Sequence, residues 1–267
     1  MRLNARHAAP REDALGWDDE GGVIAATDGV TRDWEAIRQG LRPYPDPSPA
    51  TDAADAAAAA LVEALSGGAA FPNAFAIANA AVAEVNARWD IPRRCDYLEH
   101  DFAGAVAAAV RLEGRSLQVG WIGDCGVAVI RDGALLYLTR DQLDEVNAHL
   151  RANPAPFGDD RRVAIRRDLR NRPSHLHKGR PVTYGVLTGE PEALHYVEIA
   201  TLDLLPGDVV CVHTDGFRPH FARAEFLAAL AAGADAWKSA IPSADERLNA
   251  ESGEYGRERS LAALQLV

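Results

Sequence analysis

Cysteine and methionine are scarce in this chain of 267 residues, which contains three of the former and one of the latter. An odd number of widely spaced cysteines excludes a disulfide framework and the ligand spacing of a zinc site. The three are Cys95, Cys125 and Cys211. No apolar run approaches the roughly 18 residues that a membrane helix needs. The opening residues, MRLNARHAAPRED, contain no apolar segment of a secretory signal. We therefore expect a cytoplasmic protein with no membrane association.

Positive charge is also in deficit. The chain has 28 Lys and Arg residues against 39 Asp and Glu residues, for a net charge of −11. This balance argues against non-specific binding to nucleic acid or to anionic membranes, and it suits a site that collects divalent cations. The hydrophobic content of 48% is ordinary for a globular protein, and the length suffices for a large core. We expect a single domain spanning residues 1–267.

Several catalytic motifs are missing. No Asp-x-Asp occurs, which leaves aspartyl-phosphate chemistry without a candidate pair, and no Gly-x-Ser-x-Gly elbow is present. Cys125 and Arg131 do match the Cys-x5-Arg spacing of cysteine-dependent phosphatases. The segment between them contains the apolar run Val127–Ile130, however, and an extended chain holds these two residues roughly 17 to 20 Å apart. We exclude that chemistry.

The hydrophobic pattern predicts an α+β chain. A helix is expected from Ser48 to Leu65, with Ser48 as N-cap and Pro49 at the first helical position. A second helix should begin at Pro72, carry an apolar stripe that reaches Trp89, and close at Pro92. A third is expected over 224–232, followed by a polar loop. Strands are expected at 14–17, 23–26, 102–112, 116–122, 127–130, 134–138, 196–199, 209–213 and 260–267.

A basic, proline-containing stretch at about 151–190 interrupts this acidic chain, and we expect it to be an irregular insert. It admits two interpretations: a solvated loop, or a flap that docks phosphorylated acidic segments by Arg–phosphate pairing. Its basic residues are Arg161, Arg162, Arg166, Arg167, Arg170, Arg172, Lys178 and Arg180.

The chain twice runs from a short apolar strand into Thr-Asp-Gly, at Thr27-Asp28-Gly29 and at Thr214-Asp215-Gly216. A strand that ends in Asp-Gly delivers a carboxylate to the edge of a sheet, where glycine lets the backbone approach a ligand closely. One such ending is usually a hairpin turn. Two of them favour a shared site.

Further carboxylates lie at the ends of predicted strands. Carboxylates with backbone carbonyls are the ligands that Mg²⁺ and Mn²⁺ prefer, and several of them share a small site only when cations neutralise them. Two such ions can clamp a phosphate and activate a water for in-line attack. The candidate residues are Glu12, Asp13, Asp28, Asp124, Asp215 and Glu258.

The order of these motifs resembles the metal-dependent type 2C serine/threonine protein phosphatases along essentially the whole chain. The matching segments are Glu12-Asp13, Asp28-Gly29, Gly123-Asp124-Cys125-Gly126, Leu138-Thr139-Arg140-Asp141-Gln142, Thr214-Asp215-Gly216 and Glu258-Arg259-Ser260. The resemblance implies a four-layer α-β-β-α sandwich of two antiparallel sheets flanked by helices. It also implies hydrolysis of phosphoserine or phosphothreonine in proteins at a centre of two Mn²⁺ or Mg²⁺ ions.

The same resemblance assigns roles to individual residues. Asp28 would bridge the two metals, and the carbonyl of Gly29 would ligate one of them. Asp13, Asp215 and Glu258 would complete the ligand shells. Glu12 would hold metal-bound water, and Asp124 is available to a third, weaker site. Asp28, Asp13 and Asp215 are thus the expected catalytic residues.

The chain also departs from the family pattern. Ala8 stands where the family commonly has a phosphate-gripping arginine, and Arg6 and Arg11 are the candidate replacements. Glu258 replaces an aspartate, and Gly-Asp-Ser-Arg has become Gly-Asp-Cys-Gly. Val30 stands where some members carry a histidine general acid, so protonation of the leaving group falls to metal-bound water. These departures leave open a catalytically weak relative that keeps the fold as a binding or regulatory module.

Overall fold

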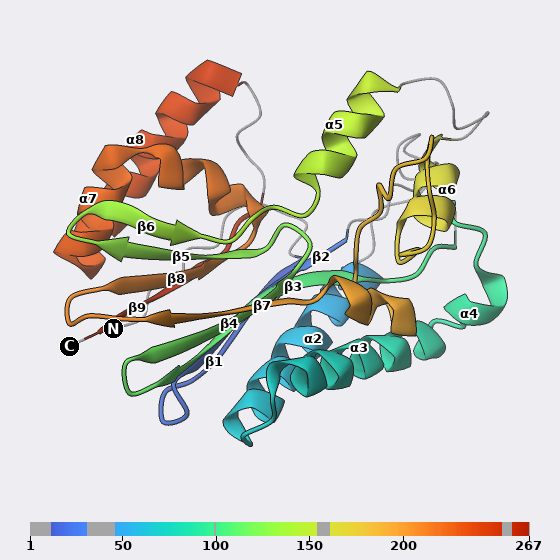
Figure 1. Cartoon of the computed structure of the whole chain (residues 1–267), viewed down its shortest axis with the longest axis horizontal. Helices are drawn as coiled ribbons and strands as arrows, with labels where there is room; N and C mark the ends of the chain where they lie inside the picture. The colour runs from blue at the N-terminus through green and yellow to red at the C-terminus, as the bar shows by residue number, and fades with distance from the viewer. Residues whose placement is uncertain (1–11, 31–45, 99, 154–160, 253–257, 267) are drawn as a thin grey trace.

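The structure is a computed structural model, and it describes residues 12–30, 46–98, 100–153, 161–252 and 258–266. Its strands form two antiparallel sheets (Figure 1). The larger sheet has the order β1-β2-β3-β4-β7: β1 (Asp13–Asp18), β2 (Val23–Gly29), β3 (Ala105–Glu113), β4 (Ser116–Ile122) and β7 (Glu198–Asp203). The smaller sheet has the order β6-β5-β8-β9: β5 (Gly126–Arg131), β6 (Ala134–Leu138), β8 (Val209–His213) and β9 (Leu261–Gln265).

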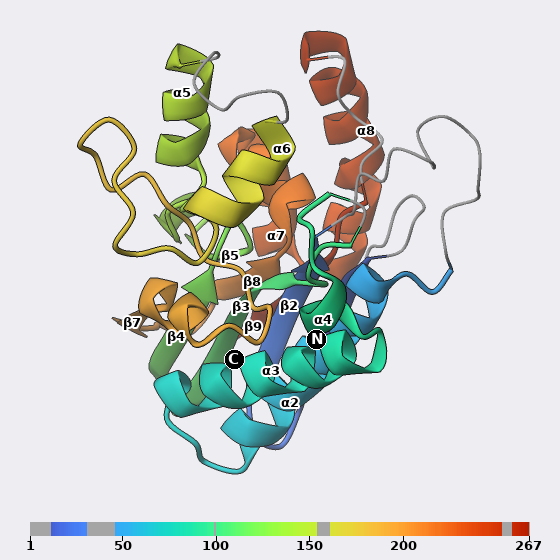
Figure 2. The ribbon, with the colours of Figure 1, turned by 90° about the vertical axis from the view of Figure 1, so that its right-hand side faces the viewer.

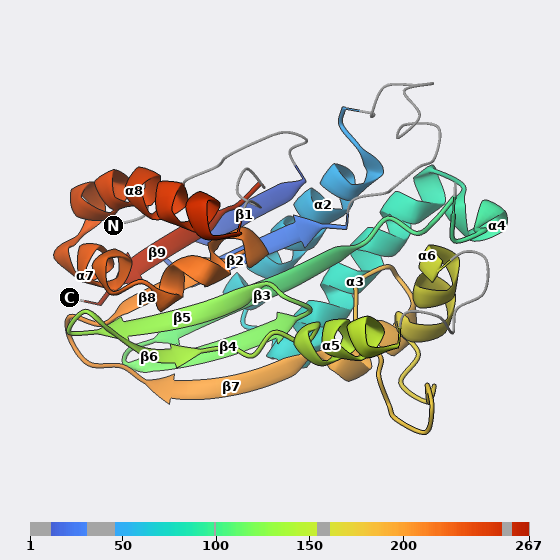
Figure 3. The same ribbon diagram turned by 90° about the horizontal axis from the view of Figure 1, so that it is seen from above.

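Helices cover the outer face of each sheet, as Figures 1 and 3 show. The larger sheet is covered by α2 (Pro49–Ser66) and α3 (Phe71–Arg88), and the smaller by α7 (Ala224–Ala232) and α8 (Ala234–Ser252). Three further helices lie at the end of the sandwich: α4 (Ile91–Arg94), α5 (Asp144–Ala152) and α6 (Arg161–Ala164). In Figure 2, α5 and α6 lie on the opposite side of the molecule from α2 and α3.

Three apolar clusters hold the layers together. The first packs α2 and α3 onto the larger sheet, the second fills the space between the sheets, and the third packs α7 and α8 onto the smaller sheet. Phe75, Trp121 and Trp237 are buried members of the three clusters in that order. Burial of apolar area on both faces of each sheet is the main stabilising contribution of such a fold. The predicted four-layer sandwich is confirmed.

The start of α2 agrees with its sequence signals. Ser48 has extended backbone angles, and its hydroxyl accepts a hydrogen bond from the backbone N–H of Thr51 at 3.1 Å. The Thr51 hydroxyl in turn accepts from the Ser48 N–H, which completes a reciprocal capping box. Pro49 occupies the first helical position, where its missing N–H costs no hydrogen bond.

Four predicted features were wrong. Trp89 is 41% exposed, because α3 ends one residue before it. Pro92 is the second residue of the short α4 instead of the end of a helix. Most of the segment after residue 232, which was predicted to be a polar loop, forms α8. The prediction missed the inward-facing apolar stripe of this helix because polar residues and Pro242 interrupt the apolar pattern. The strand expected at 196–199 lies at Glu198–Asp203, where alternating exposure on a sheet edge masks the apolar signal. The stripe of α8 comprises Trp237, Ile241, Ala244 and Leu248.

The basic stretch contains ordered helical turns, and four of its arginines are paired with carboxylates. Arg170 is buried and makes two hydrogen bonds to Asp101, at 2.7 and 2.8 Å, while Arg166 approaches the same carboxylate at 3.4 Å. Arg172 pairs with Glu190 at 2.8 Å, and Arg167 pairs with Asp168 at 2.7 Å. Arg166 and Arg170 anchor the stretch to Asp101, which lies outside it, whereas the other two pairs lie within the stretch. Within the described residues, no helix is long and apolar enough to cross a lipid bilayer.

Candidate metal centre

Strand pairing brings the predicted acidic residues to one end of the sandwich. In the antiparallel register of β1 and β2, Asp13 lies directly opposite Asp28. The backbone N–H of Gly29 donates to the carbonyl of Glu12 at 3.0 Å, which extends this pairing by one step. In the other sheet, the N–H of Thr214 donates to the carbonyl of Ser260 at 3.0 Å. Asp215 and Glu258 therefore flank a second pair of strand ends.

Hydrogen bonds join the two sheets at this end. The Thr214 hydroxyl donates to the Asp13 carboxylate at 2.8 Å and accepts from the Ser260 N–H at 2.9 Å. The Glu12 N–H donates to the Glu258 carboxylate, and the Ser48 hydroxyl donates to the Glu12 carboxylate. The N-cap of α2 and both strand pairs thus contribute to one network. Its members include both residues of the Glu-Asp pair and the final predicted ligand.

Burial and mutual repulsion make these carboxylates hard to ionise. Loss of hydration raises the pKa of Asp13 to about 7, and the charge of Glu258 adds to that effect. The pKa of Asp28 lies well above its ordinary value because of burial, reinforced by the charges of Asp13 and Asp215. Burial also raises the pKa of Asp124 to about 7, with Asp215 the leading charge. The acids predicted to share a site therefore lie close enough to repel one another.

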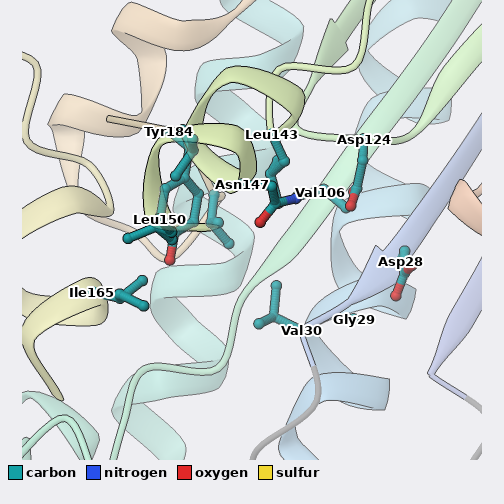
Figure 4. Close-up of a pocket in the computed structure, with 12 residues that line it drawn as sticks. Asp28, Gly29, Val30, Val106, Asp124, Leu143, Asn147, Leu150, Ile165 and Tyr184 are labelled. Atoms are coloured by element: carbon teal, nitrogen blue, oxygen red, sulfur yellow. The ribbon is translucent and has the colours of Figure 1, made fainter. Parts of the chain in front are cut away.

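Asp124 is held by a tight turn after β4. Gly123 has a φ of +82°, and a Cβ at this position would lie 2.2 Å from a methyl group of Val106, so glycine is required. Gln142 fixes the same turn through two hydrogen bonds. Its side-chain oxygen accepts from the Gly123 N–H at 2.8 Å, and its backbone N–H donates to the Gly123 carbonyl at 3.2 Å. Asp124 and Asp28 both line a pocket of about 390 Å³ (Figure 4).

Comparison with solved structures returns serine/threonine phosphatases over the whole chain. The catalytic domain of PstP from Mycobacterium tuberculosis, solved in complex with two manganese ions, is 17% identical with a TM-score of 0.60, and the match covers 100% of this chain and 97% of that one. The PPM phosphatase MsPP from Mycobacterium smegmatis is 20% identical, with a TM-score of 0.59 and coverage of 100% and 98%. RsbX in complex with magnesium is 11% identical, with a TM-score of 0.51 and coverage of 100% and 94%.

This chain has the fold of the PPM serine/threonine phosphatases. The fold implied by the type 2C resemblance is therefore confirmed. No protein-family profile matches the chain, and no curated protein matches its sequence. At these low identities the sequence resemblance rests on the short motifs at the strand ends.

The donor set of the phosphatase-fold site fits hard divalent cations by its chemistry. It offers only carboxylate and backbone oxygens, and its raised pKa values show a concentration of negative charge that cations would relieve. In the described part of the chain, no three Asp, Glu, His or Cys side chains converge on one ion as they stand. Asp13 and Glu258 each accept a hydrogen bond from the protein instead. A carboxylate accepts at both of its oxygens, so a hydrogen bond to one oxygen does not by itself exclude an ion from the other.

Arg218 is a cation beside the site that the sequence motifs do not single out. It follows Asp215-Gly216-Phe217, and its guanidinium donates to the carbonyl of Thr139 at 2.8 Å. Its charge lowers the otherwise raised pKa values of Asp124 and Asp141. The carboxylate of Asp141 accepts from the Leu143 N–H at 2.7 Å, as in a local turn. Arg6 and Arg11, the predicted phosphate ligands, lie outside the described residues.

The positions of Arg131 and His213 in the phosphatase fold show what these two residues do. Arg131 pairs with Asp208 through two hydrogen bonds of 2.7 and 2.8 Å, and it is separated from Cys125 by strand β5. Cys125 and Arg131 therefore lie at opposite ends of an extended strand and do not share a phosphate-binding loop. His213 is fully buried, and its Nδ1 lies 2.8 Å from the carbonyl of Thr214, so it is a residue of the core.

We predict that Gly29→Ala disrupts the site without removing a carboxylate. An added Cβ would lie 2.4 Å from the carbonyl oxygen of Ala50 and 2.9 Å from that of Glu12, both of them backbone atoms. The chain must then move β2 away from α2 or from Glu12. We expect loss of Mn²⁺ binding together with a lowered melting temperature. Gly114→Ala is the matched control for glycine loss in the same sheet, because a Cβ there meets nothing within 4 Å, although its φ of +62° adds some strain. Equal Mn²⁺ affinity in wild type and Gly29→Ala would contradict the prediction.

We predict an unusual pH dependence for the metal-free protein. Asp13 loses its proton near its ordinary pKa of 3.8 in the unfolded chain but at about 7 in the folded one. Between these values the folded state binds more protons, so stability falls as pH rises and the loss is complete above pH 7. One unit of pKa shift is about 1.4 kcal/mol, and we expect at least ~1 kcal/mol of this loss to vanish in Asp13→Asn. Urea unfolding in EDTA at pH 5 and pH 8 measures the difference. Parallel behaviour of wild type and variant would rule out the shift.

Proposed function

We propose that this chain is a Mn²⁺- or Mg²⁺-dependent phosphomonoesterase that removes phosphate from phosphoserine or phosphothreonine in proteins. The supporting observation is the gathering of Asp13, Asp28, Asp215 and Glu258 at one end of a PPM-type sandwich, where burial and the neighbouring charges raise the pKa values of Asp13 and Asp28. PstP and RsbX, which share this fold, were solved with manganese and magnesium. The nature of the donors and the fold thus support the same class of reaction.

We assign the metal ligands to these four carboxylates and to the carbonyl of Gly29, with Glu12 beside them and Asp124 available to a third, weaker site. Two bound ions would supply Lewis acidity toward the phosphoryl oxygens and a nucleophilic water at neutral pH. Pairing of β1 with β2 holds Asp13 and Asp28 face to face, so their relative positions are set before any ligand binds. The Thr214 hydroxyl orients the Asp13 carboxylate by a hydrogen bond to one of its oxygens.

Other residues of the chain act on the phosphate and its surroundings. Arg6 and Arg11 remain the proposed phosphate ligands, and Arg218 supplies a fixed positive charge beside Asp124 that counters the negative field of the site. Val30 offers no acidic hydrogen, so the bound ions would have to supply the acid for the leaving group. The pocket beside Asp28 and Asp124 has a largely aliphatic lining.

A second candidate is a binding or regulatory module that keeps the fold and has little catalytic power. It is favoured by the hydrogen bonds that occupy Glu258 and Asp13, and by Ala8 at the position of the usual arginine. Such a module would bind a phosphoprotein without turning it over.

One assay separates the two candidates. Phosphate release from a phosphothreonine peptide is measured with wild-type protein in Mn²⁺, in Mg²⁺ and in EDTA. The phosphatase predicts release that depends on the divalent ion and disappears in EDTA. Absence of release in all three conditions, together with retained binding of the phosphopeptide, would leave only the binding module.

A further inference from the structure

The pocket beside the candidate metal centre is larger than a phosphate group requires, and its far side is apolar. Asp28 and Asp124 form one side of its volume of about 390 Å³. Opposite them in Figure 4 lie Leu150 of α5, Ile165 and Tyr184. The remaining lining is mostly aliphatic. The space that lies next to the acidic residues is therefore a compartment for an apolar group.

The apolar wall is part of a supported cluster and is not a chance gap between loops. Val146 and Leu150, which are four residues apart on α5, are both buried, and they pack in one cluster with Leu169 and Val182. Ile165 and Tyr184 pack against the same cluster. The Asp101–Arg170 ion pair anchors the segment that carries Ile165, and the N–H of Tyr184 donates to the carbonyl of Leu169 at 3.2 Å. The wall is built in advance of any ligand.

The chemistry of the lining selects its occupant. A charged side chain placed against these aliphatic groups would lose its hydration without gaining a partner, which is costly, whereas an apolar side chain gains by leaving water. Four arginines of the neighbouring basic stretch are already paired with carboxylates of the protein, so they are less available to bind an acidic segment of a substrate. A phosphoresidue at Asp28 and Asp124 would direct its own neighbours along this wall.

We propose that this pocket is a specificity subsite that receives an apolar side chain lying within two positions of the phosphorylated residue of the substrate. The inference rests on the proposed phosphatase function and deepens it by naming the substrate class. Asn147 is the polar member of the wall on α5, and it is exposed, so its side chain sets the polarity at the rim of the subsite.

Three phosphothreonine peptides test the subsite: one flanked on both sides by glycine, one by leucine and one by glutamate. Burial of one leucine side chain is worth roughly tenfold or more in kcat/KM, so we expect the leucine peptide to exceed the glycine peptide by that factor and the glutamate peptide to fall below it. Hydrolysis of all three at equal kcat/KM would overturn the subsite and leave the phosphatase standing. Hydrolysis of none in Mn²⁺ would instead overturn the proposed function.

Two variants and one control test whether the peptide preference arises at this wall. Asn147→Lys places a cation on the wall, and we expect it to reverse the preference between the leucine and glutamate peptides. Ala148→Lys, an exposed neighbour on α5 outside the pocket lining, is the matched control and should leave the preference unchanged. Leu150→Ala, checked for folding by its melting temperature, should reduce the leucine advantage. An unaltered preference in Asn147→Lys would place the selectivity elsewhere.

Discussion

Asp28→Asn is expected to lower the Mn²⁺-dependent hydrolysis of a phosphothreonine peptide by roughly a thousandfold, or about 4 kcal/mol of transition-state stabilisation. The reason is its position. Asp28 lies opposite Asp13 in the sheet, and its pKa responds to Asp13, Asp215, Asp124 and Glu258 together. An asparagine has nearly the same size but carries no charge, so the variant keeps the shape of the site and loses the ligand that the others surround.

The same substitution separates loss of chemistry from loss of structure. In EDTA at pH 8 the unfolded chain ionises Asp28 freely, whereas burial and the neighbouring acids of the folded metal-free site raise its pKa, and Asp28→Asn removes that penalty. We expect the variant to be more stable than wild type under these conditions and almost inactive in Mn²⁺. Asp203→Asn, an exposed carboxylate at the end of β7, serves as the charge-matched control and should change neither property. Activity of Asp28→Asn within a few-fold of wild type would refute the assigned role.

The second large effect is expected at the buried ion pair that anchors the segment around the pocket. Asp101 and Arg170 are 3% and 2% exposed and share two hydrogen bonds. Asp101→Ala leaves the buried guanidinium of Arg170 without its partner, and such losses cost about 3–5 kcal/mol. We expect a corresponding drop in the free energy of unfolding, measured by urea titration.

Two further variants test that interpretation. Asp168→Ala breaks the exposed Arg167–Asp168 pair in the same stretch and should leave the unfolding midpoint unchanged. Adding Arg170→Met to Asp101→Ala removes the uncompensated charge and should recover a large part of the lost stability. A double variant no more stable than Asp101→Ala would show that the cost arises from packing and not from charge.

The strands and acids were predictable because their signals are local. An apolar run ending in Thr-Asp-Gly specifies both a strand and the place where its carboxylate emerges, and Ser48-Pro49 specifies the start of α2. The predicted strands that carry Asp28 and Asp215 correspond to β2 and β8. The site residues Glu12, Asp13 and Glu258 lie beside them through hydrogen bonds between strand ends.

Other features depend on contacts that are distant in sequence. The apolar stripe of α8 packs into the third apolar cluster. The sequence did not predict this helix because most of its residues are polar. Nothing in the sequence singles out Arg170 from the other basic residues, because its partner Asp101 lies 69 positions away in the chain. The apolar pocket joins α5, the end of β2 and Tyr184, and no local pattern joins these segments. Arg218 likewise became notable only through its proximity to Asp124.

The most direct measurement is calorimetric titration of Mn²⁺ into metal-free wild type and Asp28→Asn at pH 7.5. We predict that wild type binds two ions per chain, with any third ion weaker, and that Asp28→Asn loses at least one of the two. Absence of Mn²⁺ and Mg²⁺ binding to folded wild-type protein would contradict the proposed metal centre, whatever the fold.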